Sequence, residues 1–249
     1  MLDTEERSGV TVLRLRHGKV NALDLELVRA ISAALGGVAP DRAVVVTGTG
    51  PAFSAGVDLR RIVDGGAAYV REFLPALAGM FMTVFDHPGP VLAAVNGHAI
   101  AGGCVIAAAC DVRVMSQGTI GLAELSVGVP FPPEGMEVMR NAIGPAVGRL
   151  VLTAPLLDPA AAQSVGLIHD VVPPEELLDS VLARAQSMLR TPPEVFAFSK
   201  RQLQQPARDR IATSADETAA VLSMWTSPST LNAIAAYLDA LGKRPGKPS

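Results

Sequence analysis

PVLAAVNGHAIAGGCVIAAACD, residues 90–111, is the stretch that decides the fold of this chain. Its first part, residues 91–95, is a short apolar run between proline and glycine, which predicts a buried strand. Its last part, residues 104–110, has no polar side chain on any face, which predicts a fully buried helix. Between them, Gly102 and Gly103 open the helix and leave backbone N–H groups unpaired at its positive end. The sequence therefore predicts a site that binds an anion, or an oxygen that is about to become one.

Outward from this stretch, the chain repeats the alternation of strand, turn and helix. Residues 10–16 alternate apolar and polar side chains, as a half-buried strand does, and residues 41–47 form a second apolar strand. Asp24 is a predicted N-cap of the helix between them, which Gly36 and Gly37 end. Strands that alternate with helices in this way predict an α/β fold with mostly parallel strands.

The remaining elements are expected in this order: a tight turn over 52–59, a helix near 69–85, a strand over 111–115, extended pieces over 119–122 and 166–172, and helices over 175–189 and 209–241. Strands are scarce after Pro145, so the C-terminal part is predicted to be helical. We expect a core over residues 1–190 and a C-terminal helical region over residues 191–249. Residues 242–249 are rich in proline, glycine and lysine and are predicted to be a frayed tail.

Composition excludes several classes of protein. The chain has 249 residues, 49% of them hydrophobic, and a net charge of −3, which fits a sizeable core and argues against a disordered chain or a nucleic-acid binder. No uninterrupted apolar run reaches the roughly 18 residues that cross a bilayer. Residues 1–10 lack the order of a signal peptide, so no membrane association is expected. The cysteines, Cys104 and Cys110, fall on different faces of one predicted helix, which leaves no disulfide and favours a reducing, cytoplasmic location.

Several common catalytic motifs are missing from the sequence. Residues 48–50 lack the lysine and hydroxyl residue of a P-loop, and neither a dinucleotide-binding glycine motif nor a G-x-S-x-G elbow is found. The four histidines have no metal-binding spacing, so no metal site is expected. His98, beside the central glycines, is interpreted as a turn residue hydrogen-bonded to the backbone.

Four short motifs, in this order and spacing, resemble the crotonase (enoyl-CoA hydratase/isomerase) superfamily: residues 54–59 (SAGVDL), 96–97 (NG), 101–104 (AGGC) and 121–124 (GLAE). The resemblance covers nearly the whole chain, from Val10 to about Leu241. It implies a crotonase-like spiral of ββα repeats with a C-terminal helical region used for trimerisation. It also implies an acyl-CoA thioester substrate, no cofactor beyond the coenzyme A of that substrate, and a homotrimer or a hexamer of two trimers.

The resemblance also assigns roles to individual residues. The backbone N–H groups of Val57 and Gly102 would form an oxyanion hole for the thioester carbonyl, where small residues and glycine let the backbone approach the oxygen. Asp58 is expected to order its turn. Four residues are assigned to the binding of substrate or coenzyme A: Ala55 and Leu59 at the adenine, Arg60 near the phosphates, and Tyr237 from the C-terminal Tyr237-Leu238 pair.

The glutamate count separates two activities within this superfamily. The hydratases that the chain resembles use two glutamates, and the positions here are Val105 and Glu124. Valine accepts no proton, whereas a single carboxylate is enough to move a double bond from the 3,4 to the 2,3 position. Glu124 lies among apolar residues of the sequence, so its pKa is expected to rise. The closest match in motif is therefore an enoyl-CoA isomerase with Glu124 as its base.

Two other functions stay open at this point. A hydratase, or another crotonase chemistry, would recruit a different second acid, for which Glu134, Glu137 and His98 are the reserve candidates. Alternatively, the chain is a non-catalytic acyl-CoA-binding protein that keeps the pocket and the backbone donors.

Overall fold

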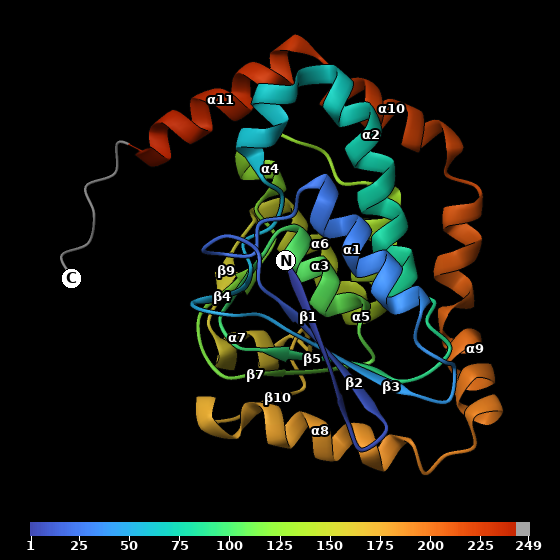
Figure 1. Ribbon diagram of the computed structural model, residues 1–249. Coiled ribbons are helices and arrows are strands. Elements are labelled where there is room, and N and C mark those ends of the chain that lie inside the picture. The colour runs from blue at the N-terminus through green and yellow to red at the C-terminus, as the bar shows by residue number, and fades with distance from the viewer. Residues whose placement is uncertain (243–249) are drawn as a thin grey trace.

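The structure is a computed structural model that describes residues 1–242 (Figure 1). The strands are β1 (Leu2–Arg7), β2 (Val10–Leu15), β3 (Ala43–Thr47), β4 (Ala52–Ser54), β5 (Val91–Val95), β6 (His98–Ile100), β7 (Val112–Met115), β8 (Ile120–Gly121), β9 (Leu156–Leu157) and β10 (Asp170–Val171). The helices are α1 (Leu25–Gly36), α2 (Leu59–Phe85), α3 (Gly102–Ala109), α4 (Glu124–Val127), α5 (Pro133–Ile143), α6 (Val147–Thr153), α7 (Pro159–Ser164), α8 (Leu177–Met188), α9 (Pro193–Ala212), α10 (Ala215–Trp225) and α11 (Pro228–Gly242), with 3₁₀ turns at Gly144–Ala146 and Pro174–Glu176. Apart from Gly242, the predicted tail lies outside the described residues.

Two sheets hold the strands, in the orders β1-β2-β3-β5-β7-β10 and β4-β6-β8-β9. Three successive units place one strand in the large sheet, the next in the small sheet, and then a helix: β3-β4-α2, β5-β6-α3 and β7-β8-α4. This repetition confirms the predicted α/β spiral of ββα units. In the large sheet β2, β3, β5, β7 and β10 run parallel, and only β1 is antiparallel to its neighbour.

The large sheet is covered on both faces, which explains its continuous apolar strands. On one face α8 packs with a cluster of buried residues that includes Val45, Leu92 and Val181. On the other face α1, α2 and α3 share the main core, and Figure 1 shows α8 on the opposite side of the sheet from these helices. β5 lies between β3 and β7, so the stretch quoted above occupies the middle of the molecule.

Several predicted elements differ from the structure. A short strand, β6, stands between β5 and α3, where the sequence predicts only a turn, and the polar β1 is not predicted at all. The predicted extended piece over residues 166–172 contains only the two-residue β10. β1 and β6 were missed because pairing with β2 and β4, rather than an apolar pattern, holds them in the sheets.

α2 begins about ten residues earlier than predicted. The glycine pair at residues 65–66 hides the helix in the sequence, and Gly66 has a non-helical φ of 57° that kinks it. By length and composition α2 also meets the requirements for a membrane-spanning helix, with half of its most apolar window buried inside the protein. Its contacts with α1, α3 and α5 are those of a core helix.

The C-terminal helices return over the core. α9 is anchored by Lys200, whose Nζ is 2.8 Å from Asp111 Oδ2, and by Gln204, whose Nε2 donates to the Phe85 carbonyl oxygen. α11 then passes over α2 and α4 (Figure 1). The division into residues 1–190 and 191–249 stays a prediction. Through its contacts with α2 and α4, the C-terminal helix α11 covers the space beside these two helices.

Candidate active site

One apolar cavity of about 170 Å³ collects most of the residues that the sequence singles out. Its walls come from the β4–α2 turn, the start of α3, the start of α4, residues 129–132 and the C-terminal helices. The sequence-predicted residues that line it are Ala55, Val57, Leu59, Gly102, Glu124 and Tyr237. Segments far apart in the sequence therefore meet at one site, and α11 covers the cavity of its own chain.

Two glycines allow the turns before α2 and α3 to touch. Gly56 has a φ of +82°, and a Cβ atom there would lie 2.6 Å from the Ile100 carbonyl oxygen and 2.9 Å from Ala101 Cβ. A Cβ atom at Gly102 would lie 2.8 Å from Leu23 Cδ1. At Gly56 only glycine fits without a shift of the neighbouring backbone, whereas at Gly102 the Leu23 side chain would have to move. The contact brings the Val57 and Gly102 amides to the same cavity.

Both amides are free to donate into the cavity. The Leu23 amide donates to the Gly56 oxygen at 2.8 Å, and the Leu23 oxygen accepts from the Asp58 amide at 2.9 Å. This pairing fixes the peptides on either side of Val57, whose own N–H has no hydrogen-bond acceptor among residues 1–242. Gly102 is the first residue of α3, so its N–H has no acceptor within the helix. Two backbone donors without an acceptor among the described residues therefore border the same cavity.

Ala101 stores backbone strain beside these donors. Its φ of 51° and ψ of −121° are unfavourable for a residue with a side chain. Hydrogen bonds hold it in place, because its N–H donates to the Gly121 oxygen at 2.8 Å and its oxygen accepts from the Val105 amide at 3.1 Å. No sequence pattern indicates this conformation, because it occurs at an alanine within a glycine-rich turn.

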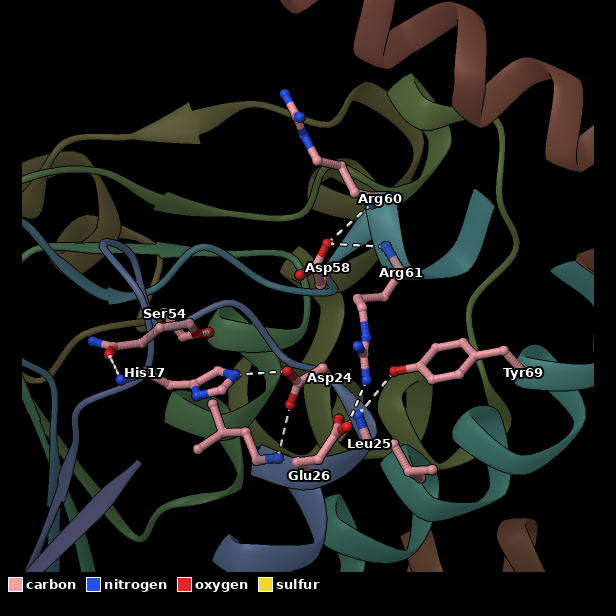
Figure 2. A network of polar contacts seen from close by, with 11 residues as sticks. His17, Asp24, Leu25, Glu26, Ser54, Asp58, Arg60, Arg61 and Tyr69 are labelled. Carbon is pink, nitrogen blue, oxygen red and sulfur yellow. Dashed lines mark hydrogen bonds and ion pairs between the residues drawn. The ribbon is translucent and has the colours of Figure 1, made fainter. Parts of the chain in front are cut away.

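Asp58 caps α2 just after the Val57 amide. Its Oδ1 accepts from the backbone amides of Arg60 at 3.0 Å and Arg61 at 3.2 Å. Figure 2 shows these bonds and the Arg60 side chain pointing away from the rest of the network. Asp58 therefore orders its turn, as the sequence predicted. Arg60 is exposed and does not line the cavity, so the structure places it outside the group of residues that meet there.

A polar clamp joins the starts of α1 and α2. The Arg61 guanidinium is 2.5 Å from Glu26 Oε1 and lies over the Tyr69 ring, 5.7 Å from its centroid. The Tyr69 hydroxyl in turn accepts from the Leu25 amide at 2.9 Å (Figure 2). The first turn of α1 is thus tied to α2 at two places, through Arg61 in the first turn of α2 and through Tyr69 further along it.

Asn21 holds the loop behind the Val57 turn and was not identified from the sequence. It is fully buried with a φ of 51°. Its Nδ2 lies 3.0, 3.2 and 3.3 Å from the carbonyl oxygens of Ala52, Phe53 and Thr49. The Asn21 backbone oxygen accepts from Ser54 Oγ at 2.8 Å. One amide side chain therefore satisfies two carbonyls within β4 and one in the turn before it, and so positions the turn that follows.

We expect Asn21→Asp to lower the free energy of unfolding by about 3 kcal/mol, because a buried carboxylate would face carbonyl oxygens with no donor to offer them. Urea unfolding followed by circular dichroism measures the change. Asn141→Asp on the exposed surface of α5 is the matched control and should change stability by less than about 0.5 kcal/mol. Equal stability of the two variants would contradict the positioning role of Asn21.

Glu124 is the carboxylate of the cavity. It is the first residue of α4, and its Oε2 is buried with no hydrogen-bond partner among the described residues. Burial raises its pKa to about 7, against the opposing effect of the Glu124 and Ala123 backbone amides. A carboxyl with a pKa near neutrality both takes up and returns a proton readily. Within residues 1–242 no other carboxylate lines the cavity.

The model of the enoyl-CoA hydratase/isomerase family matches residues 5–241 of this chain. The chain belongs to this family. Human mitochondrial enoyl-CoA delta isomerase 1 is 26% identical over 99% of this chain and 84% of the relative. A putative enoyl-CoA hydratase of Thermus thermophilus is 33% identical over 74% of this chain and 75% of the relative. The crystal structure of human mitochondrial delta3-delta2-enoyl-CoA isomerase superimposes with a TM-score of 0.90 at 27% identity, covering 98% of this chain and 99% of that chain.

Family membership makes this protein an acyl-CoA-processing enzyme and confirms the resemblance read from the motifs. Both isomerases and hydratases are among its relatives, so the family alone does not choose between the two activities. The choice depends on which acids face the cavity of this enoyl-CoA hydratase/isomerase.

The reserve acids lie outside the cavity. Glu134 lines a separate hollow between α2, α5 and α10. Glu137 is buried in ion pairs with Arg140 and Arg210. His98 is exposed, and its Nδ1 accepts from the Thr119 amide at 3.2 Å and lies 3.0 Å from Thr119 Oγ1. The predicted hydrogen bond to the backbone is therefore confirmed, but His98 begins strand β6 and is not part of a turn. None of the three lines the cavity that holds Glu124.

Within residues 1–242, no group of three or more histidine, cysteine or acidic side chains is gathered as a metal site would require. Cys104 and Cys110 are buried free thiols in and just after α3. Glu124, the backbone of Val57 and Gly102 and the apolar walls are the groups that the cavity offers to a substrate.

Proposed function

We propose that this enzyme converts 3-enoyl-CoA thioesters to 2-enoyl-CoA thioesters with a single glutamate base. The observation that carries the proposal is the position of Glu124 as the cavity's carboxylate, while the buried Val105 occupies the position of the second hydratase glutamate. A double-bond shift needs one proton carrier, whereas hydration needs two acid–base groups. The human isomerase relative and its crystal structure, both aligned over nearly the whole chain, support this choice.

The mechanism follows from the three groups at the cavity. The thioester oxygen accepts hydrogen bonds from the Val57 and Gly102 amides. The Glu124 carboxylate removes a proton from C2, and the electron pair moves onto the thioester oxygen as a dienolate. Each backbone donor stabilises that charge by about 3 kcal/mol. Glu124 then returns the proton to C4, the double bond settles between C2 and C3, and the carboxylate is restored.

The rest of the substrate is placed by the walls. We assign the adenine end to Ala55 and Leu59 and the phosphates to the exposed Arg60, with Tyr237 of α11 closing the cavity from the other side. No cofactor is proposed beyond the coenzyme A carried by the substrate.

The first test is incubation of the purified protein with a 3-enoyl-CoA and, separately, with a 2-enoyl-CoA. We expect the 3-enoyl substrate to gain the absorbance of a conjugated thioester without a change of mass. Addition of one water molecule to the 2-enoyl substrate, a gain of about 18 mass units, would instead identify a hydratase. Binding of both thioesters without turnover would identify an acyl-CoA-binding protein.

Hydration is the second candidate because curated relatives at 33% and 34% identity carry hydratase names. It requires a second acid near Glu124. The positions of Glu134, Glu137 and His98 outside the cavity argue against it. A variant without the Glu134 carboxylate and the His98 imidazole tests this candidate. If that variant still adds water to a 2-enoyl-CoA, neither residue is the second acid.

The rate of isomerisation should depend on pH through Glu124. Because the base acts as carboxylate, kcat/KM for a 3-enoyl-CoA is expected to rise with pH and to level off above the Glu124 pKa of about 7. Initial rates between about pH 5 and 9 measure the midpoint. A midpoint near the ordinary glutamate value of 4.5 would show that the carboxyl is solvated and not the buried base described here.

We further propose that the enzyme is a homotrimer, or a hexamer of two trimers. The described surface exposes large apolar side chains on α6 and α9, namely Leu152 at 74%, Phe198 at 65% and Leu203 at 75%. Such side chains gain free energy when a second copy covers them. Light scattering coupled to size exclusion should give three or six times the 25.8 kDa chain mass. A monomer mass would refute the proposal.

A further inference from the structure

The apolar end of the cavity is closed by a thin wall. Phe131 and Pro132, in the segment between α4 and α5, line the cavity on one side. On its other side, Phe131 lines a larger hollow of about 520 Å³ between α5, α9 and α10. Phe131 is 7% exposed, so its ring fills the space between the two.

The wall is fixed at both of its ends. Trp225 is buried and donates from Nε1 to the Pro130 carbonyl oxygen at 2.9 Å. The Pro132 oxygen accepts from the Met136 amide at 3.0 Å, which anchors the segment to the first turn of α5. Phe131 therefore sits on a short segment between two hydrogen bonds. A substrate could move it only by breaking one of them or by rotating a ring with little free space.

The side chains around the wall also set its packing. A Cβ atom at Gly135 would lie 3.7 Å from Phe81 Cε2 and 3.8 Å from both Phe131 Cδ1 and Val105 Cγ1. These three side chains thus converge on the same point of α5 and form an apolar floor. The floor lines the same cavity as Glu124 and offers no partner to a polar group. It suits an unbranched hydrocarbon chain.

We propose that Phe131 sets the longest acyl chain that the cavity accepts. The inference rests on the proposed function, because it places the thioester oxygen at Val57 and Gly102 and so directs the acyl chain past Glu124 to the floor. Each methylene that enters the apolar space contributes to binding until the chain reaches the Phe131 ring. Beyond that length the chain must displace a packed side chain, and the gain per methylene is lost.

The test compares wild type and Phe131→Ala on 3-enoyl-CoA substrates from about six to about sixteen carbons. For wild type, kcat/KM should rise by about fourfold per methylene and then fall once the chain reaches the wall. For Phe131→Ala, the fall should move to longer chains, with kcat/KM for the longest substrate raised by about tenfold or more. The shortest substrate should change little. The same optimum in both proteins would overturn the role of Phe131.

Met224→Ala is the matched control, because Met224 lines the outer hollow but not the cavity and is 45% exposed. It should leave the chain-length profile of wild type unchanged. Phe131→Leu keeps most of the buried volume, so it tests the wall if Phe131→Ala does not fold. It should move the optimum in the same direction by a smaller amount.

Binding of saturated acyl-CoA thioesters of the same lengths separates this inference from the proposed function. Turnover with a profile that Phe131→Ala leaves unchanged would refute the wall and leave the isomerase intact. Absence of turnover, together with an affinity limit that Phe131→Ala moves to longer chains, would refute the isomerase and support the wall. Affinities that depend on chain length identically in both proteins would refute the wall whatever the activity.

Discussion

Glu124→Gln is expected to lower kcat for 3-enoyl-CoA isomerisation by roughly 10³- to 10⁴-fold. Glutamine has nearly the shape of a protonated glutamate, so the cavity and the backbone donors stay in place, but it cannot take the C2 proton. Affinity for a saturated acyl-CoA should therefore change by less than about threefold, because the acid is not needed for ground-state binding. Steady-state rates and competitive inhibition by the saturated thioester measure the two quantities.

The same substitution should make the protein more stable at pH 8. The native state holds the Glu124 proton up to about pH 7, whereas the unfolded chain loses it near 4.5. Between these values the native state binds more protons, so the free energy of unfolding falls as pH rises. Glutamine removes this loss, which amounts to about 3 kcal/mol, or about 9 °C in melting temperature. At pH 4 wild type and variant should melt together.

Glu134→Gln is the matched control for both measurements. Glu134 has a buried carboxylate oxygen without a partner, like Glu124, but lines a different hollow. Its kcat should stay within about twofold of wild type. Full activity of Glu124→Gln, or an equal loss in both variants, would remove Glu124 from the mechanism.

Gly56→Ala is expected to lower kcat by about 100- to 1,000-fold. The added methyl group would lie 2.6 Å from the Ile100 oxygen, at a backbone contact that no rotamer change relieves. The turn before α2 must therefore move away from the turn before α3. Since Val57 and Gly102 sit on these two turns, their amides no longer point at one oxygen. The loss should appear mainly in kcat, because donation to the developing oxyanion matters most in the transition state.

Gly144→Ala separates this steric effect from backbone strain. Gly144 also has a positive φ, of 53°, but a Cβ atom there would meet nothing within 4 Å. Both variants should lose about 1 to 3 kcal/mol of stability from the unfavourable backbone conformation. Only Gly56→Ala should lose activity. Normal turnover by a folded Gly56→Ala protein would show that the two turns need not touch for catalysis.

Local patterns of the sequence were enough for the main elements of the spiral. The apolar run of β5, the all-apolar α3 and the capped start of α1 are each visible within about ten residues, because burial on both faces or a cap leaves its own pattern. β1 and β6 leave no such pattern, since their partners rather than their side chains hold them in a sheet. Gly66 concealed the first ten residues of α2, because a kinked helix reads as a break.

The site shows the same division. Val57, Gly102 and Glu124 could be named from the motifs that resemble the family, and the structure brings all three to one cavity. Residues that act through packing could not. The three carbonyls that Asn21 satisfies come from a loop about thirty residues away, and the wall at Phe131 depends on a bond from Trp225 of α10.

The sequence by itself determined the alternation of strands and helices and the glycine turns. It also determined that Glu124 is present while Val105 stands at the position of the second hydratase glutamate. These follow from short-range patterns of burial and backbone freedom. Only the tertiary structure decided that Gly56 touches the Ile100–Ala101 turn, how far burial raises the Glu124 pKa, which reaches about 7, and that Phe131 separates two hollows. The physical reason is that steric contact, desolvation and cavity shape arise between segments distant along the chain, and no local pattern encodes the distance between them.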